Sequence, residues 1–461
     1  MSGTVSSCRD AANRYFTERY PGYRLDNFRT EQGGFTTFYL SPLSDGVPCP
    51  ECGSHCERFH DHRSQVIRDW DIVAGRMIDV VVPSRRLRCQ CGYQKTEPSP
   101  NWVLPGHRIT RRLGAFVQFL LRGRINNKEV QRITGVSWGT IKALDIAQLE
   151  PRFENVDLSS AARLAFDEIS IEKGHSYATV VMDLERRRIL WVCRGKRRVD
   201  IEPFFKALSD RGLTGNIASV SVDMNAGYPA LVSEYLPDAK LAYDRFHVMQ
   251  KFTREVLVEA KKESIRQARE RVQSIPRAER TDEHYSRRDA EVRLLKKSEW
   301  LVITKPELLS GDKQERLNHL RECNALFRDL YPLAAQLRAI WEAKGKDEAQ
   351  ERLKAVVDLC GAAAENHNFK PLKRFASMLI RRAEGIVNAC LVGFGTNILE
   401  GANNTAKVIK RVAYGFRDFK YFALKLKAAF PGKDKKPSLT GWDLVWNGAS
   451  TYAGLPVTFP K

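Results

Sequence analysis

Three short apolar runs in the middle of the chain each end in an aspartate, and this pattern narrows the folds that the sequence can adopt. The acids are Asp167 after Leu164-Ala165-Phe166, Asp223 after Val220-Ser221-Val222, and Asp244 after Leu241-Ala242-Tyr243. A carboxylate at the edge of a hydrophobic sheet is costly unless it is paired, hydrogen-bonded or bound to metal. We therefore expect these acids to serve a site at the edge of a sheet.

The elements around these runs predict a particular sheet. Residues 163–193 read as a three-stranded meander, and a helix, a strand ending at Asp223, a second helix and a strand ending at Asp244 follow. The order βββαβαβ is that of an RNase H-like sheet. If its first and fourth strands are neighbours, about 5 Å apart, Asp167 and Asp223 face a common space that could hold two divalent ions.

Two hard cations such as Mg²⁺ or Mn²⁺ could activate water or a 3′ hydroxyl on one side of a phosphorus and stabilise the leaving oxygen on the other. The chemistry expected is in-line phosphoryl transfer. A third acid normally completes such a site, and Glu400 is the best candidate. Glu168 follows Asp167 directly and points to the opposite face of a strand, so we do not expect it to bind metal.

Glu400 lies in a segment that favours a helix, which Thr396 or Asn397 can cap. Helical spacing places several amide and cationic side chains on the same face as Glu400. One face thus combines a metal-binding acid with groups that can contact a DNA backbone. The residues expected to contact DNA here are Asn403, Asn404, Lys407, Lys410 and Arg411. The alternative is an ordinary solvated amphipathic helix.

Cysteines cluster near the start of the chain in a pattern typical of a metal site. Cys49-x-x-Cys52 and Cys89-x-Cys91 can bring four thiolates to one tetrahedral Zn²⁺, and 89 − 52 = 37 positions leave room for a β-ribbon between the pairs. The second pair is one residue shorter than the commonest spacing, which leaves Cys56, His60 or His62 as a substitute ligand. The alternative is four incidental thiols.

The segment NNKEVQRITGVSWGTIKALDIAQL predicts a helix-turn-helix. Asn127 can cap the first helix, Gly135 can form the turn and Ser137 can cap the second helix. In a DNA-reading unit, groove and phosphate contacts would come from Ser137, Trp138, Thr140 and Lys142. An ordinary helical hairpin is the alternative.

The composition of the chain favours a polyanion, such as nucleic acid, as its partner. Basic residues exceed acidic ones by 75 − 55 = +20, a surplus that attracts nucleic acid and releases counterions when phosphates are neutralised. No uncharged apolar run approaches the length of a membrane span, and the first residues do not resemble a signal peptide. The expected location is the cytoplasm, in association with the nucleoid.

Several stretches closely resemble the bacterial insertion-sequence transposases of the ISL type, a DDE branch with an N-terminal zinc module. They are AFDEISIEKGHSYATVVMDLE, SVDMNAGYPALVSEYLPDAKLAYDRFHV and TNILEGANNTAKVIKRVAYGFRDF, within a match from Cys49 to about Leu426. The resemblance implies that Asp167, Asp223 and Glu400 form the catalytic triad. Asp244 and His247 resemble an Asp-x-x-His element that shapes such sites, with second-shell support as their expected role.

The resemblance also implies a function. The expected enzyme binds the terminal inverted repeats of its own element in double-stranded DNA, nicks the ends, and directs the freed 3′ hydroxyl at target DNA. Pairing two ends calls for a homodimer or a higher oligomer, and the helical insertion is a candidate interface. The alternatives are a non-catalytic DNA-binding regulator and another RNase H-like nuclease.

The texture of the sequence predicts a multidomain α/β chain in which an all-helical insertion, with breaks at Pro276, Pro306, Pro332 and Pro371, interrupts the catalytic domain. The expected divisions are an N-terminal segment of unassigned role (1–48), a zinc-binding module (49–100), a helix-turn-helix domain (105–155), the first part of the catalytic domain (160–250), the insertion (251–390), the last part of the catalytic domain with Glu400 (391–430) and a tail (431–461).

Overall fold

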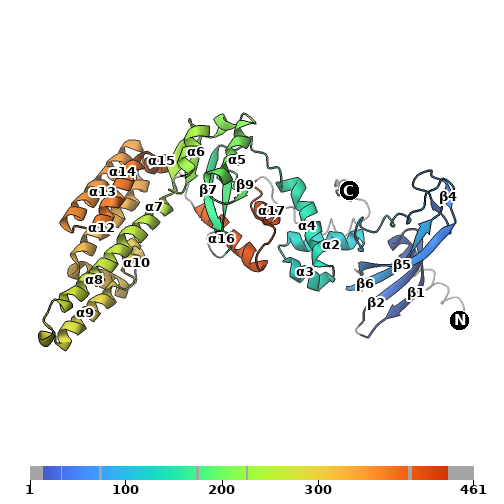
Figure 1. Cartoon of the computed structure of the whole chain (residues 1–461), viewed down its shortest axis with the longest axis horizontal. Coiled ribbons are helices and arrows are strands. Elements are labelled where there is room, and N and C mark those ends of the chain that lie inside the picture. Colours follow the sequence, from blue (N-terminus) through green and yellow to red (C-terminus); the bar gives the residue numbers. More distant parts are fainter. Residues whose placement is uncertain are drawn as a thin grey trace. The chain divides into compact units, whose positions relative to one another are not determined.

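The computed structural model describes residues 14–32, 34–71, 75–172, 176–224, 227–392 and 397–433. It is a mixed α/β structure that divides into two compact units. The first unit holds the described residues up to 155 together with 412–416, and the second holds 156–411 and the described chain from 417 onward. Figure 1 traces the elements of each unit along the chain.

The first unit is built on a four-stranded sheet with the order β1-β2-β6-β5. The long strands β5 and β6 form an antiparallel hairpin, and β2 joins β6 in parallel. The segment before Cys49, for which the sequence indicated no role, thus supplies two of the four strands of the sheet. Its core includes Tyr20, Ile67 and Val80. The strands are β1 (Tyr23–Thr30), β2 (Thr36–Pro42), β5 (Phe59–Asp71) and β6 (Arg76–Leu87).

Three helices complete the first unit: α2 (Arg111–Arg122), α3 (Asn127–Thr134) and α4 (Trp138–Phe153). Gly135 ends α3 with φ of 63°, a left-handed conformation that glycine adopts at little cost, and Ser137 caps α4 as expected. The expectation that Asn127 caps α3 is wrong by one residue. Asn126 is the cap, because its extended backbone lets its side chain accept from the Glu129 N–H at 2.9 Å.

A buried carboxylate links this sheet to α2. Asp69 on β5 is fully buried and accepts hydrogen bonds from the Tyr20 hydroxyl at 2.8 Å and from the Arg112 Nε at 2.9 Å. Burial by itself would raise the pKa of Asp69, but the hydrogen bond and charge of Arg112 outweigh burial and lower it. The neighbouring Arg68 donates to the Gly135 carbonyl at 2.9 Å, so β5 also holds the turn between α3 and α4.

The second unit contains a five-stranded sheet with the order β11-β10-β7-β8-β9. Strands β7, β8 and β9 form an antiparallel meander, and β10 and β11 run parallel to β7. The first and fourth strands of the expected βββαβαβ order are therefore neighbours. The elements are β7 (Arg163–Ser170), β8 (Tyr177–Asp183), β9 (Arg188–Arg194), α5 (Arg198–Ser209), η1 (Thr214–Asn216), β10 (Ser219–Val222), α6 (Gly227–Tyr235) and β11 (Lys240–Tyr243).

Helices continue from the sheet into a long insertion, and α12, α13 and α14 lie side by side (Figure 1). One hydrophobic core extends from Leu164 and Phe166 of the sheet to Phe375 and Val387 of these helices. The elements are α7 (Arg245–Phe252), η2 (Thr253–Leu257), α8 (Val258–Gln273), η3 (Arg277–Glu279), α9 (Asp282–Leu295), α10 (Ser298–Ile303), η4 (Pro306–Leu308), α11 (Gly311–Cys323), α12 (Ala325–Ala339), η5 (Ile340–Glu342), α13 (Lys346–Asn366), α14 (Lys370–Arg381) and α15 (Ala383–Val392).

Three of the four expected proline breaks mark helix boundaries, because Pro276 lies between α8 and η3, Pro306 begins η4 and Pro371 lies in the first turn of α14, but the break expected at Pro332 is wrong. Pro332 lies inside α12. An internal proline costs a helix about 3 kcal/mol. Leu330, Leu333 and Ala334, which flank it on the same helix, are buried in the core. Their burial, at roughly 1.5–3 kcal/mol for a large apolar side chain, offsets that cost.

Two helices close the second unit, α16 (Asn397–Val412) and α17 (Phe419–Ala429), and α17 packs beside β9. In the part of the chain that the structure describes, no helix combines the length and the apolar character needed to cross a lipid bilayer.

Candidate active site and metal-binding cysteines

Strand register aligns the three aspartates that the sequence singled out. Ser221 of β10 is paired with Ala165 of β7, and Val222 is paired with Tyr243 of β11. Continuing the two registers places Asp223 opposite Asp167 and Asp244 opposite Asp223. The three acids therefore lie in one row across neighbouring parallel strands, at the carboxyl ends of β10 and β11.

His247 stands over this row. Its Nδ1 lies 3.4 Å from Asp223 Oδ1, and its Nε2 lies 3.9 Å from Asp167 Oδ1 and 3.7 Å from Asp244 Oδ2. Asp244 caps α7, accepting from the Phe246 N–H at 2.7 Å, and this cap places His247 in the first turn of the helix. The Asp244 side chain is only 9% exposed, whereas that of Asp223 is 32% exposed. Asp223 is thus the more accessible of the two acids.

Asp167 is held from two sides. Its Oδ1 accepts from the Glu168 N–H at 2.7 Å, and its Oδ2 accepts from Nδ2 of Asn403 at 2.5 Å. Burial raises the pKa of Asp167 above its ordinary value, and the nearby charge of Asp223 adds to this, while the two hydrogen bonds and His247 act in the opposite direction. The carboxylate is therefore costly to keep charged here without a cation.

Glu168 faces away from the row, as the alternation of a strand requires. Its carboxylate accepts from the Tyr228 hydroxyl at 3.3 Å and lies 3.2 Å from the Lys196 ammonium. The Tyr228 hydroxyl and the Lys196 ammonium thus stabilise the Glu168 carboxylate, which needs no metal for this.

Helix α16 brings the distant C-terminal segment to the row. Asn403 contacts Asp167, and the Lys410 ammonium donates to the Ser170 carbonyl of β7 at 2.7 Å. Glu400 lies one turn before Asn403 on the same helix. The Glu400 side chain and the predicted cap at Thr396 or Asn397 lie outside the described residues and side chains.

The other polar residues of the α16 stripe do not share this inward orientation. Asn404, Lys407 and Arg411 are exposed. The sequence predicted a DNA contact for Lys410 as well. In the structure its ammonium donates to the Ser170 carbonyl instead, and burial lowers the pKa of Lys410. The stripe thus divides into residues that bind the sheet and residues that face solvent.

Sequence reasoning missed two side chains that hold the loop after Asp223 and the strand beside it. Arg382, between α14 and α15, donates to the Met224 carbonyl and lies 5.2 Å from the ring centre of Tyr243. Asn388 of α15 donates to the Leu241 carbonyl at 3.0 Å. Both lie in the insertion, far from the aspartates in sequence, and no local pattern distinguishes them from other polar helix residues.

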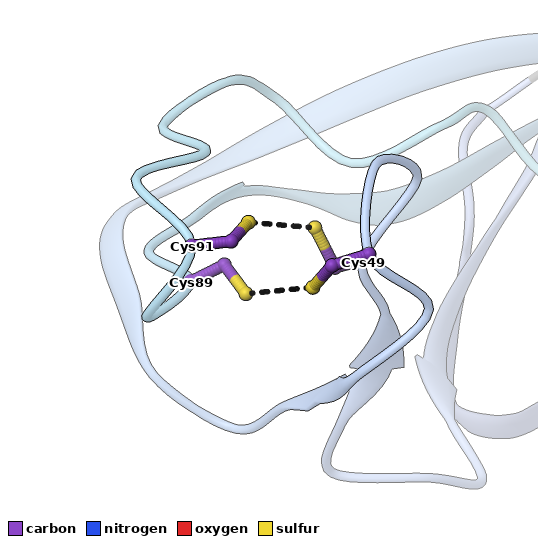
Figure 2. A group of neighbouring side chains, drawn as sticks. Cys49, Cys89 and Cys91 are labelled. Atoms are coloured by element: carbon purple, nitrogen blue, oxygen red, sulfur yellow. Dashed lines mark hydrogen bonds between the residues drawn. The ribbon is translucent and has the colours of Figure 1, made fainter.

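The four expected cysteines converge at one end of the first unit, beside the short ribbon of β3 (Val47–Pro48) and β4 (His55–Cys56). Cys49 and Cys91 have their sulfur atoms 3.7 Å apart, and those of Cys52 and Cys89 are 3.5 Å apart. Figure 2 shows the labelled Cys49 on one side of a small space and Cys89 and Cys91 on the other. Zn–S bonds of about 2.3 Å in a tetrahedron place sulfur atoms roughly 3.8 Å apart, so the set fits a metal ion of this kind.

Matching turns build the two halves of this group. The N–H of Gly53 donates to the Cys49 carbonyl at 2.9 Å, and that of Gly92 donates to the Cys89 carbonyl at 3.1 Å. Both glycines have positive φ, 72° and 92°, as the tight turn behind each pair requires. The two turns present the thiols toward each other.

The proposed substitute ligands do not join the group among the described side chains. Cys56 packs against the cluster, but its sulfur donates toward the Ser54 carbonyl at 3.7 Å, and burial raises its pKa to about 11. A hydrogen bond from Ser54 lowers the pKa of Cys52 to about 6, which favours the thiolate that a metal binds. His60 is exposed, and the His62 side chain lies outside the description.

The residues expected to read DNA lie at the start of α4. Ser137 and Thr140 are joined by two hydrogen bonds, including the cap from the Thr140 N–H at 3.3 Å. Trp138 is 49% exposed, and the Lys142 ammonium lies 5.7 Å from its ring centre. An aromatic ring and a cation are therefore presented together on the surface of this helix.

A row of carboxylates at the ends of parallel strands is typical of enzymes that use divalent cations to act on phosphodiesters. Comparison with known proteins agrees with that class. Residues 164–426 match the family model of the ISL3-type DDE transposases.

Two relatives are transposases of insertion sequences. The transposase for element IS1001 of Bordetella parapertussis is 33% identical over 416 residues, which is 90% of this chain and 96% of that protein. The transposase for IS1557 of Mycobacterium tuberculosis is 26% identical over 63% of this chain and 64% of its own length. The chain therefore belongs to the ISL3-type DDE transposases, and it is a DNA transposase.

Among solved structures, the Drosophila P element transposase strand transfer complex overlaps 69% of this chain and 90% of its own chain, with a TM-score of 0.34 and 12% identity. That overlap is too weak to define a shared fold.

Proposed function

We propose that this transposase binds the terminal inverted repeats of its element and cleaves and transfers DNA strands by two-metal phosphoryl transfer. The observation that carries the proposal is the aligned row of Asp167 and Asp223, with α16 packed against it through Asn403. Asp167, Asp223 and Glu400 are the proposed triad. Glu400 is assigned because its helix position is one turn from a residue that reaches Asp167.

The residues fit the divalent metal that the family implies. Carboxylate oxygens are the ligands that Mg²⁺ and Mn²⁺ prefer, and two of them line up at the ends of neighbouring strands. A cation here would offset the cost of burying the Asp167 charge. When bound, such a pair of ions supplies an activated oxygen nucleophile and stabilises the leaving oxygen.

The remaining residues of the row have positioning roles in this proposal. Asp244 caps α7 and holds His247 beside Asp223. Asn403 donates one amide N–H to Asp167 and so orients the carboxylate. Lys410 fastens the same helix to β7 through the Ser170 carbonyl. These contacts restrict the acids to one geometry, as second-shell partners do in metal sites.

The strand order β11-β10-β7-β8-β9 supports an RNase H-like catalytic domain. We assign its parts to 160–250 and 391–430, with 251–390 as the insertion, 49–100 as the zinc-binding module and 105–155 as the helix-turn-helix. In this scheme zinc is structural, bound by Cys49, Cys52, Cys89 and Cys91. Helix α4 then reads the bases of the repeat through Trp138 and Lys142, and Ser137 and Thr140 lie close to the phosphate backbone of the DNA.

The exposed half of the α16 stripe supports a second contact with DNA beside the triad. Asn404, Lys407 and Arg411 are solvent-facing on the helix that carries Glu400. We propose that they hold the phosphates next to the scissile bond. Because two element ends must be joined, the active form in the DNA complex is a homodimer or a higher oligomer.

The test of this function is the variant Asp223→Asn. Loss of one metal-binding carboxylate should lower magnesium-dependent nicking of labelled element ends by about a thousandfold or more, since a metal ion contributes several kcal/mol to the transition state. Binding to the same DNA should persist. Asp238→Asn, at an exposed position in the same unit, is the matched control.

Mapping the nicks separates the alternatives. Cleavage at the repeat ends that depends on Asp223 supports the transposase reaction. Cleavage without regard to the repeats would favour another RNase H-like nuclease, and repeat binding with no cleavage by the unaltered protein would favour a regulator. Normal nicking by Asp223→Asn would refute the proposed site.

A further inference from the structure

The helical insertion contains a large open groove whose lining includes none of the proposed catalytic residues. It has a volume of about 1510 Å³, and we call it the basic groove. It is lined by α8, α9, α11, the start of α12 and residues 367–374. Pockets for small ligands usually measure about 300–1,000 Å³ and are mostly apolar. The basic groove is larger than these, and its lining has nine lysine and arginine residues against three glutamates.

Every acid of the groove wall is already paired with a cation of the same wall. Glu259 lies 2.8 Å from the Lys262 ammonium. Glu263 lies 2.6 Å from Arg266, and Glu291 lies 2.5 Å from Arg271. The two charges of each pair cancel, so the net charge of the groove comes from its other residues.

The other charged residues of the wall are all cations. Arg287 and Arg293 of α9, with Lys370 and Arg374 of α14, are exposed, and none of them has an acidic partner among the described residues. Two further cations of the wall have partners. Arg316 donates to the carbonyls of Leu294 and Arg293 and so holds the end of α9, and Arg288 lies 2.8 Å from Asp289. Four free cations from two helices distant in sequence thus face one groove.

We propose that the basic groove binds the phosphate backbone of duplex DNA, at a site separate from the helix-turn-helix and from the α16 stripe. Positive side chains that have no acid partner attract polyanions, and DNA is the polyanion on which a transposase acts. A second copy of the chain is a poor occupant, because each copy carries a net charge of +20. The inference rests on the chain's action on DNA and adds a contact that the family match does not assign.

The experiment compares two quadruple variants of the full chain. The groove variant is Arg287→Gln, Arg293→Gln, Lys370→Gln and Arg374→Gln. The control variant is Arg269→Gln, Lys305→Gln, Lys313→Gln and Lys354→Gln, which removes four exposed cations of the same insertion that do not line the groove. Equal circular dichroism melting curves of the two variants establish equal folding.

The measurement is the affinity for an element-end duplex between 50 and 300 mM salt. Each lost phosphate contact should flatten the plot of log affinity against log salt by about 0.9, so the groove variant should lose about 3 to 4 units of slope and the control less than about 1. Asp223→Asn should keep the unaltered slope, which separates this test from that of the catalytic site.

Two results would overturn the proposal. Equal slopes for the groove and control variants would mean that the groove does not contact DNA. If, in addition, the groove variant alone changed the sedimentation of the DNA-free protein, the groove would be an interface for an acidic protein segment instead.

Discussion

Asn403 illustrates how one side chain can belong to a different surface from the one that its helix spacing indicates. It shares a face with Glu400 and Lys407, and this spacing alone assigned it to DNA. In the structure its amide N–H donates to Asp167, and its Oδ1 is buried with no hydrogen-bond partner among the described residues. A buried amide oxygen without a partner is costly, and a metal ion or its bound water would satisfy it.

The variant Asn403→Ala should therefore act through metal and not through DNA. Loss of the hydrogen bond that orients Asp167 should raise the magnesium concentration for half-maximal nicking by about 10- to 100-fold, the range typical of second-shell partners. The control is Asn404→Ala at the exposed neighbour, which is proposed to contact phosphate and should therefore leave the magnesium concentration for half-maximal nicking unchanged. The prediction would be contradicted if Asn403→Ala lowered the salt dependence of DNA binding and left the magnesium requirement unchanged. Asn403 would then contact DNA, as its helix spacing indicated.

At the scale of elements, α16 has one edge that contacts the sheet and an adjoining edge that faces solvent. Asn403 and Lys410 reach β7, and Lys407 and Arg411 form the exposed edge, which we call the outer side. Helix α15 approaches β11 closely at Gly385, where an added Cβ would lie 2.5 Å from the Tyr243 ring. The helices on either side of residues 393–396 thus both pack on the sheet that carries the aspartates.

The outer side of α16 yields a prediction about salt. Lys407→Gln combined with Arg411→Gln should weaken binding to element-end DNA and reduce the salt slope by about 2, roughly one unit for each phosphate contact. Lys240→Gln is the control, because this exposed cation starts β11, at the end of the sheet opposite the aspartate row. An unchanged slope in the double variant would mean that this face does not meet phosphate.

At the scale of the whole molecule, the chain consists of two compact units with different chemistry. The first has the four-cysteine group and the helices α2 to α4, and the second has the aspartate row and the insertion. In the first unit the buried Asp69 network joins the sheet to α2. The Arg68 side chain of the same sheet donates to the Gly135 carbonyl, so the first unit has its own buried and hydrogen-bonded connections between sheet and helices.

This division predicts the effect of metal removal. The purified chain should contain about one zinc, and Cys52→Ser should lose it by elemental analysis, whereas Cys323→Ser, at an exposed cysteine of the insertion, should keep it. In calorimetry without magnesium, a zinc chelator should lower the transition of the first unit and leave that of the second in place. A folded, metal-free protein with unchanged melting would contradict the zinc site.

The sequence by itself determined the parts whose signal is local. Cysteine pairs before glycines, Gly135 and Ser137 around a turn, and apolar runs ending in acids all act within a few residues, and the structure places them as expected. Local patterns failed where burial overrides them, as at Pro332 within α12.

Only the tertiary structure decided the contacts between distant segments. It set Asn403 against Asp167, Arg382 against the loop after Asp223, and four unpaired cations in one groove of the insertion. Helical spacing specifies which side chains share a face, but the direction in which that face points depends on packing against elements many residues away.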